Sequence, residues 1–432
     1  MAAVLAAPGA GAQDALEATE NGVTEDTITV TVVAAIEVPG FPGLFQGNHD
    51  GVDAWADYIN NSCKPKNTCL AGRKVEVKHF DSKLSGDEAR AAFRQACEDS
   101  FALVGTGVLL LQNFDDITQC ADKAGAATGM PDFGVVVTEP NEQCAETNFS
   151  INPASLQCDT FGEHPQKYVV NMGPTLYYVK KFGKQKAAFL YPSDSASAKN
   201  AQVPIFHAQG EHGLEIVSEI DLSALAPQTE YTSVAGALRD NGATYAKSGL
   251  AFDSTVKMRK EAATQGVDME IWDCSLQCYD KKLIAPENVD AVEGQYVYIP
   301  FLPFLGKGSE AKQNKMLRNF IKYTNREGRA QDGFAIQAFA AGLFITQAIE
   351  DAIGGDNNAL TRDVVLAAAA DIHDFDADGM ISPTDVGGKK PNSCFMLNQV
   401  KNGEFKRIYP KKKGTFDCSK KNRTTITEDI IQ

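Results

Sequence analysis

The chain lacks the excess of basic residues that general nucleic-acid binding requires. Its 432 residues include 41 lysines and arginines against 56 aspartates and glutamates, so the formal net charge is -15. Proteins that bind nucleic acid through its phosphates depend on clustered cations. Nucleic acid is therefore not an expected partner.

Long hydrophobic runs are also absent from the sequence. No uninterrupted apolar run approaches the 18 or so residues that cross a bilayer, and the hydrophobic fraction of 43% is that of an ordinary globular protein. We therefore expect a folded chain without a membrane-spanning helix. Its length exceeds one ordinary hydrophobic core and predicts two or three lobes.

Signatures of catalysis are missing as well. The sequence contains no phosphate-binding G-x-x-x-x-G-K-[ST] loop, no complete dinucleotide fingerprint, no G-x-S-x-G nucleophile elbow and no H-E-x-x-H helix. Its six histidines are scattered, and none shares a helical face with a second histidine or a cysteine. We therefore do not expect an enzyme, and no cofactor is predicted.

Zinc-binding cysteine pairs are lacking, although cysteine itself is not. No C-x-x-C occurs, and the one C-x-x-x-C has no second pair beside it, which disfavours a zinc site. An even number of cysteines, ten, in a chain with a signal-like leader instead favours disulfides, each closing a local loop in an oxidising compartment. Sequence alone cannot fix the connectivity. Sequential pairing predicts Cys63 with Cys69, Cys97 with Cys120, Cys144 with Cys158, Cys274 with Cys278, and Cys394 with Cys418.

The first residues indicate export. Residues 1–12, MAAVLAAPGAGA, form a small apolar stretch that ends in an A-x-A pattern, as at a signal-peptide cleavage site. No basic segment precedes this stretch. We interpret residues 1–12 as the remnant of a signal peptide, which predicts a periplasmic or secreted protein. The alternative is an alanine-rich leader of a cytosolic protein.

Strands and helices alternate along most of the chain. The β-branched run at 27–36 is followed by a helical pattern at 49–60, a strand at 74–80, a helix at 86–99 and a strand at 101–104. A helix at 114–124 and a strand at 133–137 complete this first set. A second set begins near residue 171 and includes strands at 187–190, 214–220, 249–252 and 269–272 with intervening helices. Such alternation predicts an α/β fold with two Rossmann-like lobes.

One acidic loop fits a calcium template in part. Asp374, Asp376 and Asp378 stand at positions 1, 3 and 5, Gly379 at position 6, and Asp385 at position 12. Aspartate is too short for the usual bidentate ligand at position 12, and no helix follows. An acidic turn without metal is the alternative, and a weak calcium site stays open.

Several segments, in order, resemble the substrate-binding proteins of branched-chain amino-acid ABC importers, the Leu/Ile/Val-binding type I periplasmic family. They are GVT (22–24), GVDAWADYIN (51–60), FALVGTG (101–107), GMPDF (129–133), VEGQYVYIPFLPF (292–304) and SCFMLNQVKNGEFKRI (393–408). The resemblance covers residues 22–418. It implies two lobes joined by three crossovers, with a ligand cleft between them.

The resemblance also implies a function and a set of boundaries. An exported member of this family captures a small ligand between closing lobes and delivers it to a membrane permease. The expected lobes are residues 24–162 with 297–362, and residues 163–296 with 363–425. The protein is expected to act as a monomer.

Candidate ligand contacts lie where strands lead into helices, because doubly wound sheets bind small molecules outside the carboxyl ends of their strands. The predicted contacts in the first lobe are Phe41, Thr106, Gly107, Leu110 and Gln112, and those in the second lobe are Tyr191, Asp194, Ser195, Phe252, Asp253 and Trp272.

The segment after Thr106 affects the predicted ligand. Amino-acid binders of the family offer serine and threonine hydroxyls there, whereas this chain continues with glycine, valine and three leucines. An unpaired ammonium beside such a wall would cost several kcal/mol. Asp194, Asp253 or Asp273 could supply a counter-charge. The ligand classes that remain open are an apolar amino acid and an aromatic or aliphatic acid.

Three functions remain open. The first is the solute-binding protein of an importer. The second is a ligand-sensing receptor domain of the same fold that signals to a protein partner. The third is an enzyme on a two-lobe scaffold, which would need a nucleophile and base that the sequence does not reveal.

Overall fold

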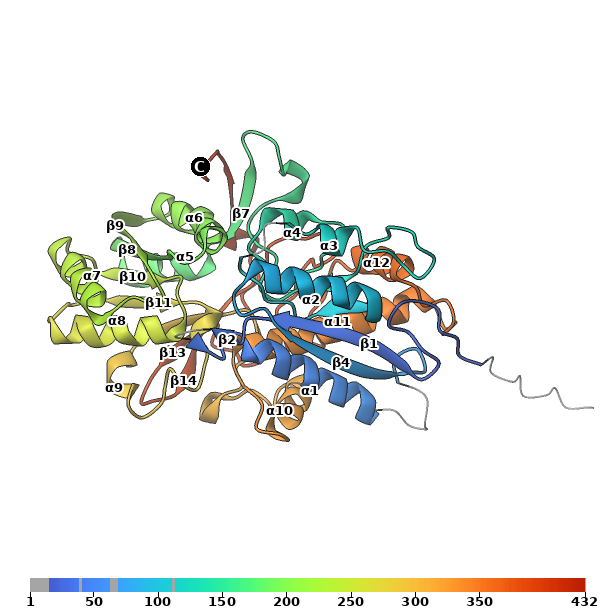
Figure 1. Cartoon of the computed structure of the whole chain (residues 1–432). Helices are drawn as coiled ribbons and strands as arrows, with labels where there is room; N and C mark the ends of the chain where they lie inside the picture. The colour runs from blue at the N-terminus through green and yellow to red at the C-terminus, as the bar shows by residue number, and fades with distance from the viewer. Residues whose placement is uncertain (1–14, 39–40, 63–68, 111–112, 432) are drawn as a thin grey trace, which may run out of the picture.

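The computed structural model describes residues 15–38, 41–62, 69–110 and 113–431, with the side chain of Phe41 excepted. Two lobes lie side by side, each built around its own sheet (Figure 1). The sheet of the first lobe is parallel, in the order β4-β1-β5-β6. Its strands are β1 (Thr27–Ala34), β4 (Lys74–Asp81), β5 (Ala102–Val104) and β6 (Asp132–Phe133).

The sheet of the second lobe has seven strands in the order β14-β13-β12-β11-β10-β8-β9. The strands β8 to β12 run parallel, and the hairpin β13–β14 is antiparallel. Their bounds are β8 (Gln185–Pro192), β9 (Leu214–Leu222), β10 (Tyr245–Ser248), β11 (Ile271–Cys274), β12 (Tyr296–Ile299), β13 (Met396–Val400) and β14 (Phe405–Tyr409). Two short antiparallel pairs complete the strands: β2 (Glu37–Val38) with β3 (Phe41–Pro42), and β7 (Lys167–Asn171) with β15 (Arg423–Thr427).

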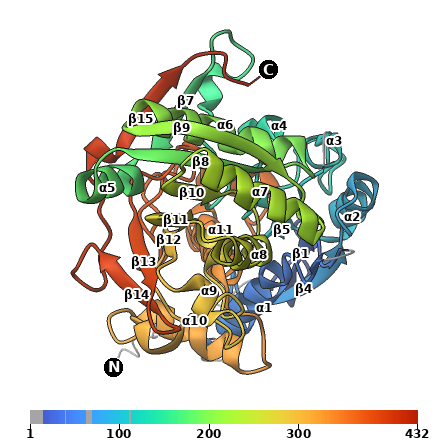
Figure 2. The same ribbon diagram turned by 90° about the vertical axis from the view of Figure 1, so that its left-hand side faces the viewer.

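Helices cover both sheets, as the parallel strands require. Those of the first lobe are α1 (Gln46–Ser62), α2 (Gly86–Asp99), α3 (Asp115–Thr118), α10 (Lys315–Asn325), α11 (Gly333–Ile353) and α12 (Arg362–Ala370). Those of the second are α5 (Gly173–Phe182), α6 (Ala196–Glu211), α7 (Gln228–Asp240), α8 (Phe252–Thr264) and the short α9 (Val289–Val292), with α4 (Pro140–Cys144) in the connection between lobes. Figure 2 turns the second lobe toward the viewer.

The chain crosses between the lobes three times. It leaves the first lobe after β6, returns to it after β12, and enters the second lobe again before β13. The pairing of β15 with β7 then ties the C-terminal segment beside the first crossing, at the top of Figure 1. The two α/β lobes and their three connections are therefore confirmed.

Most predicted elements are present, but two are wrong, and the strand predicted at 133–137 is only the short β6, which ends at Phe133. The helix predicted at 114–124 ends at Thr118, because Cys120 is bonded to Cys97 and the chain turns back, with the Gly129 N–H donating to the Cys120 carbonyl. The strand predicted at 249–252 is instead β10, at 245–248. Residues 249–251 form the loop after it, and Phe252 already begins α8.

One predicted lobe boundary also differs from the structure. Residues from 363 onward were expected in the second lobe, yet α12 packs against α11 of the first. Val365 and Phe375 share a hydrophobic cluster with Trp55 and Phe344. The C-terminal part of the first lobe therefore extends past residue 363, because these apolar side chains complete its core.

The apolar helix α11 is long and apolar enough to cross a membrane by length and composition alone. Most of its residues are buried against α1, β5, β6 and α12. It is thus the central core helix of the first lobe, and its hydrophobicity is explained by packing on all sides.

Four of the five predicted disulfides are formed: Cys97–Cys120, Cys144–Cys158, Cys274–Cys278 and Cys394–Cys418. Each closes a loop of 4 to 24 residues. Sequential pairing is confirmed for these four. Cys63 lies outside the described residues, as does the leader at 1–12.

The contact between α1 and α11 depends on glycine. A Cβ added at Gly51 would lie 2.2 Å from the carbonyl oxygen of Ala335 on α11, which is backbone and cannot rotate away. We expect Gly51→Ala to push the helices apart and lower the free energy of unfolding by about 1–3 kcal/mol, measured by urea denaturation.

Gly236→Ala is the matched control, because this glycine lies in helix α7 and an added Cβ there meets nothing closer than 3.8 Å. The control should stabilise the chain by up to about 1 kcal/mol through helix propensity. Equal effects of the two substitutions would contradict the close approach of α1 and α11.

Candidate ligand-binding cleft

A cleft of about 560 Å3 lies between the lobes, a size typical of small-molecule sites. Loops that follow the carboxyl ends of parallel strands line it from both sides. In the first lobe these loops follow β1, β5 and β6, and in the second they follow β8, β10 and β11. The fold thus places the cleft where α/β sheets bind ligands.

The wall from the first lobe is mainly apolar. Val38, Phe45, Leu109 and Val136 line it, together with Phe334 at the start of α11. The Phe45 and Phe334 rings meet edge to face, with their centroids 5.0 Å apart. Such a wall favours an apolar ligand, because it removes hydrocarbon surface from water.

The wall from the second lobe contains a buried cation. Lys247, near the end of β10, is only 4% exposed and lines the cleft. Its Nζ lies 3.3 Å from Oδ2 of Asp273 on the neighbouring strand β11. Asp273 also accepts hydrogen bonds from the hydroxyls of Tyr178, at 2.9 Å, and Tyr245, at 2.8 Å.

Both tyrosines of this network stay protonated. Burial and the neighbouring Asp273 carboxylate raise the pKa of Tyr178 and of Tyr245 well above the usual value. Their hydroxyls therefore act only as donors to Asp273. The Asp273 carboxylate therefore accepts two hydrogen bonds and forms an ion pair with Lys247 within the lobe.

Four carboxylates line the cleft itself: Asp194, Asp253, Asp280 and Asp332. Asp194 accepts hydrogen bonds from the Ser223 hydroxyl and the Ala224 N–H, both at 2.6 Å. Asp332 caps α11 by accepting from two backbone N–H groups, and burial raises its pKa to about 6.

The remaining two, Asp253 and Asp280, lie near lysines of the rim. Burial raises the pKa of each carboxyl, and the charge of Lys282 opposes that rise. Asp280 also accepts from the Lys282 N–H at 2.7 Å. Asp280 is thus held by the backbone of its own loop, and Asp253 lies within the electrostatic influence of Lys282 and Lys257.

The lobes touch at one rim of the cleft. The hydroxyls of Ser195 and Ser197, at the start of α6, donate to the Leu109 carbonyl of the first lobe at 3.1 and 3.0 Å. The Ser197 hydroxyl also lies 3.1 Å from that of Thr138. These contacts hold the cleft closed on this side.

The structure brings four predicted contacts together in the cleft: Asp194, Ser195, Phe252 and Asp253 all line it. Their roles as ligand contacts stay predictions. Gln112 lies outside the described residues, and of Phe41 only the backbone, in β3, is described.

The five other predicted contacts do not line the cleft. The Thr106 hydroxyl points inward and donates to Asp132 at 2.7 Å, and Gly107 packs on the Asn48 side chain. Leu110 is exposed on the surface. The buried Tyr191 donates to Glu219, whereas Trp272 packs beneath the Arg259 guanidinium on the far face of the sheet.

Sequence reasoning missed Lys247. The misplaced strand at 249–252 left Lys247 in a loop, whereas the segment Tyr245 to Ser248 is a fully buried strand. A lysine inside a short strand followed by glycine was the available signal, because lysine is rarely buried unless it is paired.

Among the described residues, the carboxylates of the acidic loop at 374–385 do not form a group of three within 4.8 Å of one another. Asp385 is bound by the His373 ring at 2.7 Å and by the Lys390 ammonium at 2.9 Å, and these contacts help to lower its pKa. Within the described ranges, the group of three side chains with ligand atoms within 4.8 Å of one another is His207, Glu211 and Glu428, which lies away from the cleft. Calcium at residues 374–385 stays a prediction.

Comparisons with known proteins place this geometry in context. A family model described as periplasmic binding protein matches residues 5–404. No curated protein matches the sequence.

Solved structures share the fold at low identity. A leucine-binding protein from Thermotoga maritima has 16% identity and a TM-score of 0.62, covering 88% of this chain and 97% of its own. A fatty acid ABC transporter substrate-binding protein from Thermomonospora curvata has 14% identity and a TM-score of 0.66, covering 92% and 97%. An R. palustris ABC transporter solute-binding protein in complex with benzoate has 15% identity and a TM-score of 0.63, covering 94% and 99%.

Proposed function

Because this chain belongs to the periplasmic binding protein family, we propose that it is an exported solute-binding protein that delivers a small apolar acid to an ABC permease. The observation that carries the proposal is the cleft between the lobes, lined by apolar side chains of the first lobe and a buried lysine of the second. The members of this family bind substrates rather than transform them, so the role is one of capture and release.

The ligand class rests on the walls of the cleft. Similar structures carry names that mention leucine, a fatty acid and benzoate, all of which combine a carboxylate with an apolar body. The apolar wall around Phe45 and Phe334 suits that body. The volume of about 560 Å3 leaves room for a ligand larger than a short aliphatic side chain.

Export is supported by the cysteines. Four disulfides within the described residues are typical of proteins that fold in an oxidising compartment. We propose a periplasmic or cell-envelope location and a monomer that requires no cofactor for binding. The permease is the implied protein partner.

Ligand retention tests this function. We expect mass spectrometry of the natively purified chain, released by mild denaturation, to reveal a bound small acid. After refolding without that ligand, calorimetry should show binding to leucine, benzoate or a fatty acid. A chain that retained nothing and bound none of them would contradict the proposal.

A further inference from the structure

The buried pair of Lys247 and Asp273 lies on one face of the second sheet. Alternation along β10 places Lys247 on the same face as Tyr245, which packs with Tyr178 of α5 and Phe206 of α6. Helix α8, which begins with Phe252 and Asp253, packs on the opposite face. The Lys247 ammonium is thus held between the sheet and the α5–α6 side of the cleft.

Asp273 holds the Lys247 ammonium in place but does not occupy all of the N–H donors of that ammonium. An ammonium group has three N–H donors, and the ion pair with one carboxylate at 3.3 Å leaves donors available to a ligand. The Asp273 side chain is wholly buried and accepts hydrogen bonds from both tyrosine hydroxyls, so its position is fixed. Lys247 lines the cleft and is the only buried cation among the described residues that do so.

A second buried polar side chain lines the same cleft. Gln209 of α6 is 2% exposed, donates through Nε2 to the Thr175 hydroxyl at 2.9 Å, and has no partner for Oε1. If the amide oxygen and nitrogen exchanged places, Oε1 would accept a hydrogen bond from the Thr175 hydroxyl, and Nε2 would be free to donate to a ligand. Buried polar groups of this kind normally have partners, so a ligand acceptor at this wall is favoured.

The face around Lys247 holds no carboxylate for an ammonium group. Among the described residues of β10 and β11, Asp273 is the one carboxylate on this face, and it already accepts two hydrogen bonds and pairs with Lys247. The other carboxylates of the cleft lie on other elements: Asp194 follows β8, Asp253 lies in the first turn of α8, and Asp280 and Asp332 lie in the loops after β11 and before α11. A ligand ammonium placed beside Lys247 would be desolvated next to a like charge and without a free carboxylate on that face, which is costly.

We propose that Lys247 binds the carboxylate of the ligand and that the cleft selects apolar monocarboxylates over zwitterionic amino acids. This inference rests on the proposed function and narrows its substrate class. The carboxylate forms a charge-assisted hydrogen bond with the Lys247 ammonium, and the apolar body lies against the first lobe.

A matched pair of ligands tests the selectivity. L-Leucine and 4-methylpentanoate share one carbon skeleton and differ by the α-ammonium group. We expect calorimetry on the full, ligand-free chain to give at least about 30-fold tighter binding of 4-methylpentanoate. Equal or tighter binding of leucine would overturn the inference and leave the proposed function standing.

A substitution tests the anchor. Lys247→Met keeps the length of the side chain and removes its charge, and should weaken 4-methylpentanoate binding about 30-fold or more. Binding of the uncharged 4-methylpentanamide should change less than threefold. Lys186→Met, at an exposed position at the start of β8, is the control and should leave both affinities unchanged.

A second variant distinguishes a loss of ligand binding from a failure of the protein to fold. Lys247→Met leaves Asp273 buried without its cation, so the double variant with Asp273→Asn removes both charges and is used where the single variant does not fold. Unchanged carboxylate affinity in a folded variant would overturn the role of Lys247. A wild-type chain that binds neither ligand nor any acid tested would overturn the proposed function as well.

Discussion

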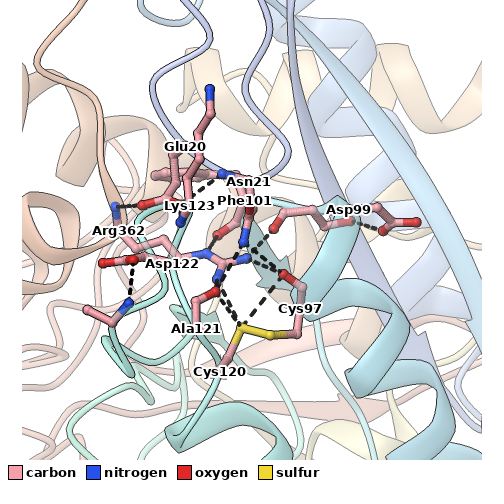
Figure 3. Close-up of a disulfide and its surroundings, with 12 residues drawn as sticks. Glu20, Asn21, Cys97, Asp99, Phe101, Cys120, Ala121, Asp122, Lys123 and Arg362 are labelled. Atoms are coloured by element: carbon pink, nitrogen blue, oxygen red, sulfur yellow. Dashed lines mark hydrogen bonds between the residues drawn. A yellow bond between two sulfur atoms is a disulfide. The ribbon is translucent and has the colours of Figure 1, made fainter.

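Replacing Arg362 by methionine should lower the free energy of unfolding by about 3–5 kcal/mol. Arg362 is wholly buried at the start of α12 and donates to carbonyls at and beyond the C-terminal end of α2 (Figure 3). Its acceptors are the carbonyls of Cys97, Ser100, Phe101 and Ala121, at 2.6 to 3.1 Å, and Sγ of Cys120.

The size of this effect follows from what methionine leaves behind. The thioether fills the space but donates no hydrogen bond, so the buried carbonyls lose their partners. Arg362→Lys should recover only part of the loss, because one ammonium cannot reach acceptors spread around a planar guanidinium.

Urea denaturation measures this change, and Arg239→Met is the matched control. Arg239 is exposed near the end of α7 and pairs only with side chains at the surface. Its removal should change stability by no more than about 0.5 kcal/mol. A similarly small effect at Arg362 would show that its hydrogen bonds contribute little.

Removal of the Cys97–Cys120 disulfide is the second large expected effect. Changing both cysteines to alanine should cost about 3 kcal/mol, because the bond closes a loop across 23 residues and restricts the unfolded chain. The same change at Cys274 and Cys278, only 4 residues apart, should cost less, about 2 kcal/mol.

The disulfide and Arg362 occupy one site, so their effects should not add. Arg362 contacts Cys120 Sγ and the Cys97 carbonyl, and loss of either anchor leaves α2 and residue 120 less well held. We expect a double-mutant cycle to give a coupling of about 0.5–3 kcal/mol. Simple additivity would show that the two stabilise the lobe independently.

Local sequence patterns predicted much of the fold. The helix predicted at 86–99 coincides with α2, where Ser85 caps the N-terminus by accepting from the Glu88 N–H. The β-branched run at 27–36 contains the buried strand β1. Such elements could be predicted because their apolar spacing and caps act within a few residues.

The candidate site was predictable only in part. Asp194 and Ser195 line the cleft because they follow β8, a strand that the alternation located. Phe252 and Asp253 also line it, although the strand predicted at 249–252 is a loop followed by the start of α8. Thr106 also follows a strand, yet its hydroxyl turns inward to the buried Asp132. Which side of the chain faces the cleft depends on strand register, and a small shift reverses it.

The sequence by itself determined the fold class and the absence of known catalytic motifs, and it predicted the four disulfides that the structure describes. Only the tertiary structure decided that Lys247 lies in the cleft and that Asp273 holds it there. These two residues are 26 positions apart and meet because β10 and β11 pair in parallel. Contacts between neighbouring parallel strands join residues from distant parts of the chain, and no local spacing records them.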